Sequence, residues 1–386
     1  MRRAMAQESP MKDFVTLQQM VLAAHEKLDP AVWEFVVGAA GSGATARRNR
    51  HALESLAFDA DIYRDVSRID LSTRLLGAEL AMPIVLAPMG SIGLVDPQAG
   101  AAAARAAEQA GVMSFFSGVA DPGIEAVCAA SKAPVVFTLY VQGDQCWLDE
   151  TLDRLAVLPL AGIAVLADTP YYSRRDHDLM NQPNTKVNRR RLYSEVLRDV
   201  RQGVASAPEE LDNAFYAAKV TWEMLEYVKR RTDLPVIAKG IMSADCATRA
   251  VDHGADVIYV SNHGGRQLDY QPGTVAVLPE VVAALGEHTK VIVDGGCLRG
   301  TDVLKCLALG ADAVGIGRVQ ALALGAGGSE VLARGLQLLE EELTVDMGLL
   351  GVTRIQELTP ERLRSAPVVG ALDVLGSYPM VMNALK

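Results

Sequence analysis

The sequence has few of the features that mark secreted, metal-binding or membrane-spanning proteins. Its five cysteines form no C-x-x-C pair and have no histidine at ligand spacing, so neither a disulfide framework nor a metal site is predicted. No apolar run reaches the roughly 18 residues that a membrane span needs. The two N-terminal arginines are not followed by the apolar stretch of a signal peptide. We therefore expect a cytoplasmic protein without a membrane span.

Positive charge is also scarce. Lysine and arginine total 37 against 47 aspartates and glutamates, which gives a formal net charge of −10. A general nucleic-acid binder needs a basic face that releases counterions from phosphates, so nucleic acid is not expected as a partner. Aromatic residues make up only 5%, but hydrophobic residues make up 50%, which is enough for a large globular core.

From about residue 80 onward, short apolar runs alternate with stretches rich in alanine and leucine at helical spacing. This alternation predicts βα units and a parallel sheet. Helices are expected over 97–111, 243–254 and 299–310, and a glycine closes or follows several of them, as at many helix ends. The predicted strands number eight and cover 83–88, 112–117, 134–140, 162–168, 235–240, 256–262, 290–296 and 312–317.

Eight such units predict an α/β fold, a (β/α)8 TIM barrel. An open doubly wound sheet is the alternative, but its glycine fingerprint should open a helix directly after the first strand, and 90–97 reads GSIGLVDP instead. We expect a single domain over 1–386, with the barrel at about 80–345. The residues before it should form helices that cap one barrel end, and a polar lid loop should span about 171–217, after strand 4.

Reactive side chains in barrel enzymes project from the C-terminal ends of the strands. His263 ends the sixth strand and Asp168 the fourth, an arrangement that predicts a catalytic base and the carboxylate that orients it. A histidine bound to a backbone partner and an ordinary helix N-cap are the structural alternatives. Lys239, in an otherwise apolar strand, should face the site, because an unpaired charge in the core is costly. Arg175 is a candidate clamp for a carboxylate.

Glycine pairs follow strands seven and eight, at 295–296 and 315–317, and Arg318 comes next. Glycines let backbone N–H groups approach an anion, and barrels commonly hold a phosphate at this place. These glycines could instead serve only tight turns. The loops together with the arginine predict a phosphorylated ligand.

Several motifs at these strand ends resemble one family. SNHGGRQLD, LPVIAKG, ADTP, LYV and DGG-x-x-RGTDV-x-K-x-LALGA followed by GIGR resemble the FMN-dependent α-hydroxy-acid oxidases and dehydrogenases, and the similarity covers about 14–380. The resemblance implies FMN as the cofactor and oxidation of a 2-hydroxy carboxylic acid to the 2-oxo acid. It also implies a homotetramer or octamer. It leaves open the electron acceptor, O2 or another, and the route, hydride or carbanion.

The resemblance further assigns roles to individual residues. It implies His263 as the base with Asp168 as its partner, and Tyr140 as a donor to the substrate oxygen. It places Arg266 and Arg175 on the substrate carboxylate, beside Phe35. The residues that it implies at FMN are Pro88, Met89, Gly90, Ser117, Thr138, Lys239, Ser261, Asp294, Gly295, Gly296, Gly317 and Arg318, and Arg299 is a further candidate for the phosphate.

The sequence also departs from the family pattern. Phe35 stands where a tyrosine is usual, in a gap-free alignment up to Asn49-Arg50, and Leu298 where an arginine usually grips the phosphate. Thr138, Leu166 and Val119 replace the usual Gln, Thr and Trp. These changes favour a larger or unusual hydroxy acid. They also leave two alternatives: an FMN barrel with another flavin reaction or an isomerisation, and a diverged ligand-binding barrel.

Overall fold

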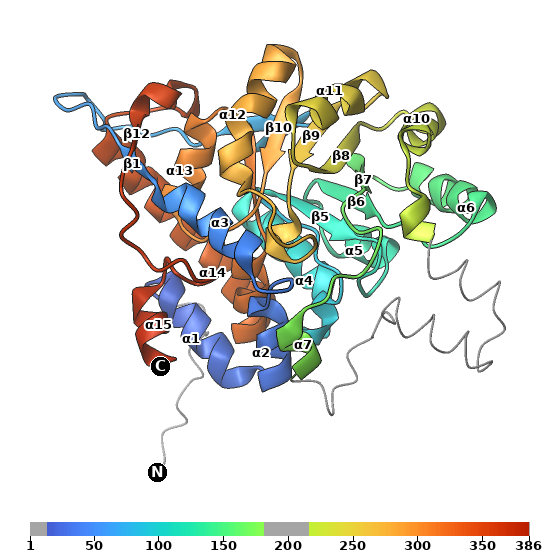
Figure 1. Ribbon diagram of the computed structural model, residues 1–386, viewed down its shortest axis with the longest axis horizontal. Helices are drawn as coiled ribbons and strands as arrows, with labels where there is room; N and C mark the ends of the chain where they lie inside the picture. The colour runs from blue at the N-terminus through green and yellow to red at the C-terminus, as the bar shows by residue number, and fades with distance from the viewer. Residues whose placement is uncertain (1–13, 181–215, 386) are drawn as a thin grey trace, which may run out of the picture.

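A closed barrel of eight parallel strands forms the centre of the protein in the computed structural model, which describes residues 14–180 and 216–385 (Figure 1). The strands follow one another around the barrel in chain order, and the last pairs with the first. Each overlaps its predicted range, so the predicted barrel is confirmed. The strands are β4 Ile84–Leu86, β5 Met113–Ser117, β6 Val135–Leu139, β7 Gly162–Leu166, β8 Val236–Ile241, β9 Val257–Val260, β10 Lys290–Val293 and β11 Ala313–Ile316.

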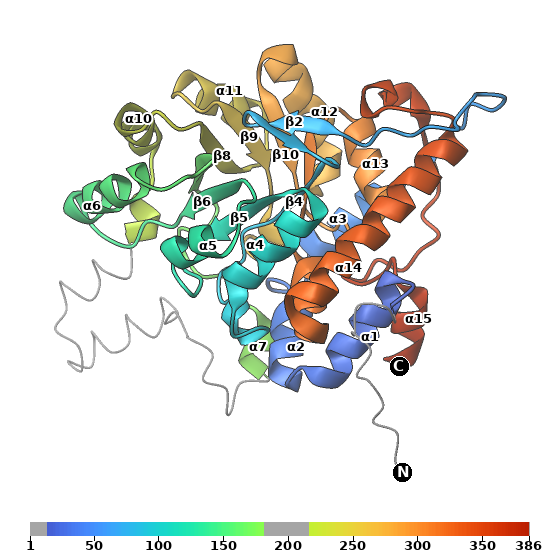
Figure 2. The ribbon, with the colours of Figure 1, turned by 180° about the vertical axis from the view of Figure 1, so that it is seen from behind.

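Helices surround this barrel. The longest, α14, bends at Gly327 and Gly328 and packs against α1, α4 and α13 on the side shown in Figure 2. The outer helices are α4 Ala99–Ala110, α5 Ile124–Ala130, α6 Gln145–Ala156, α10 Trp222–Arg231, α11 Ala244–Asp252, α12 Thr274–Leu285, α13 Gly300–Ala308, α14 Arg318–Leu350 and α15 Pro379–Ala384. Short 3-10 turns lie at η2 Ile92–Leu94, η3 Tyr216–Lys219, η4 His263–Gly265, η5 Gly286–His288, η6 Ile355–Glu357 and η7 Pro360–Arg362.

Three N-terminal helices precede the barrel, as the sequence predicts: α1 Leu17–Lys27, α2 Pro30–Val37 and α3 Ala44–Glu54. Thr16 and Gln19 form a capping box at the start of α1, and Asp29 caps α2 before a proline at its first position. α3 contacts the turn η4 that follows β9. α2 and α3 therefore cover the C-terminal end of the barrel, where the functional side chains are expected.

Residues 56–80 form strands rather than the expected helices. β1 Leu56–Phe58 pairs with β12 Leu363–Ser365, and β2 Thr73–Leu75 forms a hairpin with β3 Ala78–Leu80. Leu76 and Gly77 both have positive φ, 50° and 79°, as a tight two-residue hairpin turn requires. Leu75 and Leu80 pack against side chains of the barrel interior. The hairpin therefore closes the N-terminal end of the barrel and leaves the C-terminal end for chemistry.

The barrel interior is filled by side chains. Phe115 and Tyr259 meet edge to face, with ring centroids 5.5 Å apart, and both are almost fully buried. Because these rings fill the interior, a ligand has room only above them, at the C-terminal strand ends.

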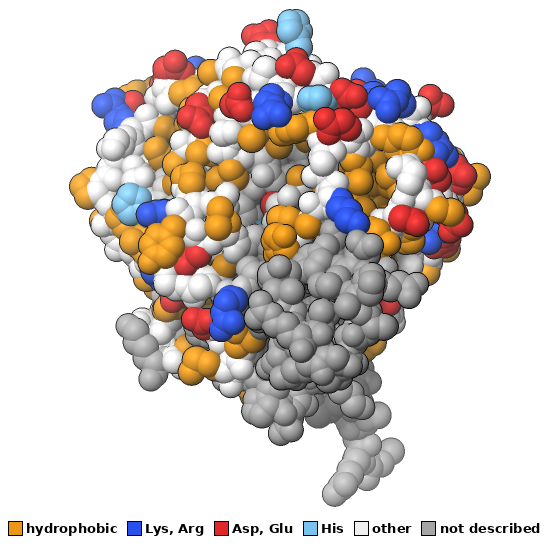
Figure 3. Space-filling model, turned by 45° about the vertical axis from the view of Figure 1, so that its right-hand side comes forward, with side chains coloured by type: hydrophobic (Ala, Val, Ile, Leu, Met, Phe, Trp, Pro, Cys, Tyr) orange, Lys and Arg blue, Asp and Glu red, His pale blue; other side chains and the backbone are white. Residues whose placement is uncertain are grey.

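Basic and acidic side chains are interspersed on the surface drawn in Figure 3. Within the described residues, no helix is both long and apolar enough to cross a membrane. Of the predicted lid loop, residues 171–180 are described and contain α7 Asp176–Met180. Residues 181–215, including the basic cluster of 189–191, lie outside the described part of the chain.

Candidate active site

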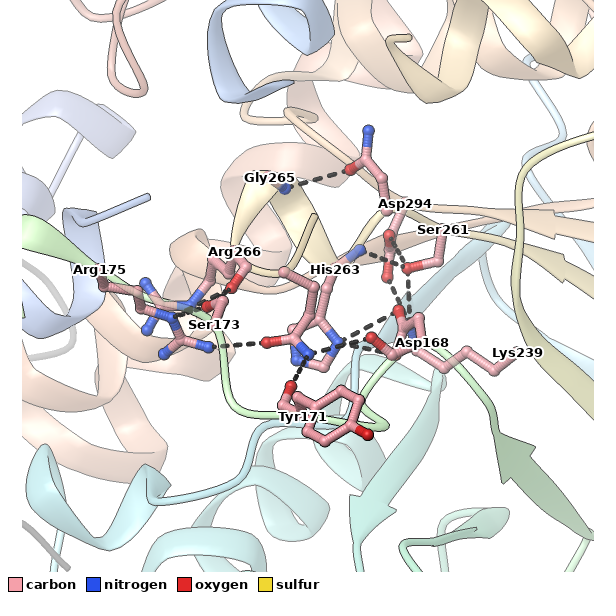
Figure 4. Close-up of polar contacts among 12 residues, drawn as sticks. Asp168, Tyr171, Ser173, Arg175, Lys239, Ser261, His263, Gly265, Arg266 and Asp294 are labelled. Atoms are coloured by element: carbon pink, nitrogen blue, oxygen red, sulfur yellow. Dashed lines mark hydrogen bonds and ion pairs between the residues drawn. The ribbon is translucent and has the colours of Figure 1, made fainter. Parts of the chain in front are cut away.

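The predicted histidine and aspartate come together at the C-terminal end of the barrel (Figure 4). His263, after β9, places Nδ1 3.2 Å and 3.3 Å from the two carboxylate oxygens of Asp168, which follows β7. His263 has a φ of +57°, a conformation that few residues other than glycine adopt and that often marks functional sites. Its backbone N–H donates to Ser261 Oγ at 3.1 Å. The local structure thus fixes the imidazole against the carboxylate.

The electrostatic surroundings keep Asp168 ionised. Burial alone would raise the pKa of this carboxyl, but the charge and hydrogen bond of His263 and the charge of Lys239 outweigh it, so the pKa is lowered from its usual value. A charged Asp168 accepts a hydrogen bond from the Nδ1–H of His263. Nε2 is then the nitrogen that can take a proton from a ligand.

Lys239, from β8, is buried at the floor of the site and is 2% exposed. Its Nζ donates to Ser261 Oγ at 2.7 Å and lies 3.4 Å from Asp294, and Ser261 in turn donates to Asp294 at 2.7 Å. The ammonium also lies 4.5 Å from the ring centroid of Tyr259. As the sequence predicts, this lysine faces the site, and Asp294 balances its charge.

Two arginines, Arg266 and Arg175, flank Phe35 in the wall of the same cavity. The guanidinium of Arg266 lies 4.8 Å from the Phe35 ring centroid and that of Arg175 lies 6.0 Å from it. Arg266 donates to the carbonyls of Phe35 and Gly38 at 2.6 Å and 3.0 Å. Arg175 donates through Nε to the Arg266 carbonyl at 3.1 Å. The two candidate carboxylate-binding arginines therefore lie close together beside an aromatic ring.

A third arginine, Arg318, lies at the glycine-rich end of the site. Its guanidinium donates to the carbonyls of Gly264 and Gly38 at 3.0 Å and 2.9 Å, and it forms no ion pair with any described residue. Burial, followed by the charge of Arg175, lowers the pKa of Arg318 to about 10. Gly295 and Gly296, with φ of 110° and 89°, lie in the same cavity wall. This end has a cation and open backbone suited to an anion.

These groups line a cavity of about 560 Å³, a volume typical of sites for small ligands and cofactors. Most of the sequence-predicted site residues lie in its wall: Phe35, Pro88, Met89, Gly90, Tyr140, Arg175, Lys239, His263, Arg266, Asp294, Gly295, Gly296, Gly317 and Arg318. Others contact that wall from behind, such as Asp168 through His263 and Ser261 through Lys239.

Arg299 is placed differently from the expectation. It does not line the cavity, and its guanidinium pairs with Glu342 of α14 at 3.0 Å. It stands at the N-cap of α13, so its side chain turns to the outer helices. We therefore omit Arg299 from the proposed phosphate site.

The cavity fits FMN by three observations. One end of the cavity has glycine backbone and Arg318, which forms no ion pair with a described residue. The floor of the cavity has the buried ammonium of Lys239. The Thr138 hydroxyl and Arg318 Nε are buried without a hydrogen-bond partner among the described residues, and such groups are costly unless a ligand or water binds them. FMN would supply a phosphate for Arg318 and the glycine backbone, and polar ring edges for the ammonium and the Thr138 hydroxyl.

Gln267 was not among the predicted site residues. Its Nε2 donates to the carbonyls of Asp168 and Tyr171 at 3.0 Å each, and its Oε1 lies 3.4 Å from Arg175 Nη2. It therefore links the aspartate of the catalytic pair with the arginine pair. Its place within SNHGGRQLD could have drawn attention to it. Tyr172, whose hydroxyl accepts from Arg175 at 2.9 Å, has no comparable sequence signal.

Fold and cavity together define a class: (β/α)8-barrel enzymes with a histidine–aspartate pair, a pair of arginines and a glycine-lined cavity suited to a phosphorylated cofactor. Residues 24–365 match the FMN-dependent dehydrogenase family. The chain belongs to this family and is an FMN-dependent oxidoreductase that acts on CH–OH groups, which confirms the resemblance seen in its motifs.

Similar proteins span nearly the whole chain. A peroxisomal (S)-2-hydroxyacid oxidase of Arabidopsis thaliana is 32% identical, over 92% of this chain and 98% of the relative. Glycolate oxidase 3 of Oryza sativa subsp. indica is 34% identical, over 87% and 92%. Among solved structures, a mandelate oxidase with (S)-4-hydroxymandelic acid is 33% identical with a TM-score of 0.81, covering 92% of this chain and 100% of the other.

Proposed function

We propose that this protein oxidises a 2-hydroxy carboxylic acid to the 2-oxo acid, with His263 as the base and FMN as the electron acceptor. The observation that carries the proposal is the contact of Asp168 with Nδ1 of His263, which lines the same cavity as Arg175 and Arg266. Relatives named as 2-hydroxyacid, glycolate and mandelate oxidases support the substrate class.

The proton moves to His263. Because Asp168 holds Nδ1, the substrate proton goes to Nε2, and the imidazolium that forms is stabilised by the Asp168 charge. Bound FMN would supply the oxidising power by accepting the two electrons together with the second hydrogen that leaves the substrate. Tyr140, in the cavity wall, is proposed to donate a hydrogen bond to the substrate oxygen.

The substrate carboxylate is proposed to bind at Arg175 and Arg266. Their existing bonds to carbonyls and side chains hold both guanidinium groups near the Phe35 ring, so little conformational entropy is lost on binding. Phe35 adds an apolar contact but no hydroxyl. With Val119 also in the cavity wall, where the family usually has a tryptophan, this favours a 2-hydroxy acid with a large side chain.

The cofactor is proposed to lie along the glycine-rich wall. Pro88, Met89 and Gly90 would contact its ring, and Ser117 and Thr138 would approach from β5 and β6. Lys239 would meet a polar ring edge and offset negative charge there. Asp294, Gly295, Gly296, Gly317 and Arg318 would line its ribityl and phosphate portion, and Ser261 supports Lys239 from behind.

The assembly and location of the protein are also proposals. The family resemblance favours a homotetramer or octamer, which light scattering of the purified protein would measure. None of the five cysteines, all described, forms a disulfide, and this pattern favours the reducing cytoplasm. We propose one domain over 1–386 and an acceptor that is O2 or another oxidant.

A dye-reduction assay tests the proposed reaction. Purified holoenzyme would be given a series of 2-hydroxy acids of increasing side-chain size, each paired with its amide, which lacks the carboxylate. We expect dye reduction and a 2-oxo acid product with the acids, and at least tenfold lower kcat/KM with the amides. His263→Asn should abolish turnover while FMN stays bound. Equal rates with acids and amides would contradict the carboxylate clamp.

A further inference from the structure

Two adjacent buried residues of α3 each bind a different loop of the site. Asn49 and Arg50 are both 1% exposed, although the segment lies before the barrel and outside its catalytic strand ends. Successive residues of a helix point about 100° apart. One side chain therefore reaches the loop after β9, and the other reaches the loop after β10.

Asn49 binds the loop that carries His263. Its Nδ2 donates to Asn262 Oδ1 at 2.9 Å, and Asn262 Nδ2 donates back to Asn49 Oδ1 at 2.8 Å. Asn49 Oδ1 also accepts from the Thr274 backbone N–H at 3.1 Å. Asn262 is the residue directly before His263, whose positive φ persists only if the surroundings fix it.

Asn262 has no hydrogen-bonding capacity left over. Its Oδ1 also accepts from the Gly265 N–H at 3.1 Å, and its Nδ2 also donates to the Pro272 carbonyl at 3.1 Å. Loss of Asn49 would therefore remove the partners of two buried groups: the Asn262 side chain, which precedes His263, and the Thr274 N–H, which follows it.

Arg50 binds the loop of the cofactor glycines. Its Nη1 donates to the Gly296 carbonyl at 2.7 Å and to Asp302 at 2.9 Å, and Nη2 donates to Glu54 at 2.6 Å. Asp302 in turn accepts from the Leu298 N–H at 3.0 Å. The loop backbone is thus held at two points by one buried ion pair.

The glycines of both loops let α3 come this close. A Cβ on Gly265 would lie 2.6 Å from the Ala46 backbone nitrogen, and one on Gly296 would lie 3.1 Å from Asn49 Cβ. Gly265 and Gly296 therefore allow α3 to pack closely against both loops, besides any contact that they make with a ligand.

We propose that Asn49 and Arg50 are positioning residues with separate tasks. Asn49 holds His263 in its reactive orientation, and Arg50 holds the backbone that binds the FMN phosphate. This inference rests on the proposed function for the role of His263, but the Arg50 half depends only on FMN binding.

Paired variants separate the two tasks. Asn49→Ala is expected to lower kcat at saturating FMN about 10- to 100-fold, with the FMN Kd changed less than about threefold. Arg50→Lys keeps the charge but loses the fork that reaches Gly296 and Asp302 together. It is expected to raise the FMN Kd about tenfold, with kcat at saturating FMN within about threefold. His51→Ala and Arg47→Lys, on exposed positions of the same helix, are the matched controls.

FMN affinity would be measured by flavin fluorescence on adding FMN to the apoprotein, and the His263 backbone by a crystal structure of Asn49→Ala. If Asn49→Ala does not fold, Asn49→Asp keeps the two acceptor bonds but loses the donor bond to Asn262, and it should lower kcat more than it lowers FMN affinity. The proposal is overturned if each variant lowers kcat and FMN affinity in parallel, or if neither differs from its control. If wild-type flavin is never reduced by a hydroxy acid, the proposed function fails, while the difference in FMN Kd between Arg50→Lys and Arg47→Lys still tests the Arg50 assignment.

Discussion

Replacing Asp168 by Asn tests how the histidine is made a base. The carboxylate lies 3.2 Å from His263 Nδ1, and both side chains are largely buried, with 12% and 19% exposed. Two unit charges about 4 Å apart interact by about 4 kcal/mol at an effective dielectric constant of about 20. This energy stabilises the imidazolium that forms when His263 takes the substrate proton, and it corresponds to a rate factor of about 10³.

The amide that replaces the carboxylate would remove this charge and could also stabilise the wrong imidazole tautomer. We expect Asp168→Asn to lower kcat/KM by about 10²- to 10³-fold while the FMN Kd stays within about threefold. Steady-state kinetics and flavin fluorescence measure the two quantities. Asp153→Asn, in an exposed pair with Arg231, is the control. A fall of less than tenfold, with FMN bound and the fold intact, would refute the assignment of Asp168 as partner of the base.

Four further predictions follow from the site. Phe35→Tyr adds a hydroxyl beside the two arginines and should lower KM for the hydroxy acid about 3- to 10-fold, as one hydrogen bond would; an unchanged KM would place the carboxylate elsewhere. Lys239→Met leaves Asp294 buried and unpaired, so unfolding titrations should show a loss of about 3 to 5 kcal/mol, against at most about 1 kcal/mol for the exposed pair in Lys290→Met. Arg318→Leu removes the cation that is proposed to bind the phosphate, so it should raise the FMN Kd at least tenfold, as flavin fluorescence would measure. Because the pKa of Asp168 is lowered, its charge stabilises the fold above about pH 4, and this contribution is lost as the pH falls through the lowered value. Urea unfolding at pH 6 and pH 3 should therefore show a larger difference in unfolding free energy between wild type and Asp168→Asn at pH 6.

The barrel could be predicted because its strands are short, apolar and regularly spaced, and because the residues at their ends carry chemistry. His263 and Asp168 were found from their positions at strand ends, and Lys239 was found because a charge within an otherwise apolar strand is costly unless it faces the site. The hairpin at 73–80 was missed because the surrounding segment was interpreted as helical, and because its turn, Leu76-Gly77, has a leucine where two-residue hairpin loops usually have Asn, Asp or Gly.

Contacts that do not follow from the barrel geometry could not be predicted. Nothing in the sequence indicates that Asn49 pairs with Asn262, more than 200 positions away, or that Gln267 links Asp168 with Arg175. The placement of Arg299 could not be predicted for the same reason: its partner Glu342 lies in α14, and the contact depends on the packing of that helix against α13. Hydrogen-bond partners of long polar side chains depend on tertiary packing, which a local pattern does not encode.

The most direct test of the central claim is the absorbance spectrum of the purified, FMN-loaded protein during anaerobic titration with 2-hydroxy acids. We predict that the oxidised flavin bands bleach on addition of a 2-hydroxy acid with a large side chain, and that one equivalent of the 2-oxo acid appears for each flavin reduced. Flavin that stays oxidised with every acid would contradict the proposed function and favour another flavin reaction. Protein that stays colourless after FMN is added would contradict the cofactor assignment itself.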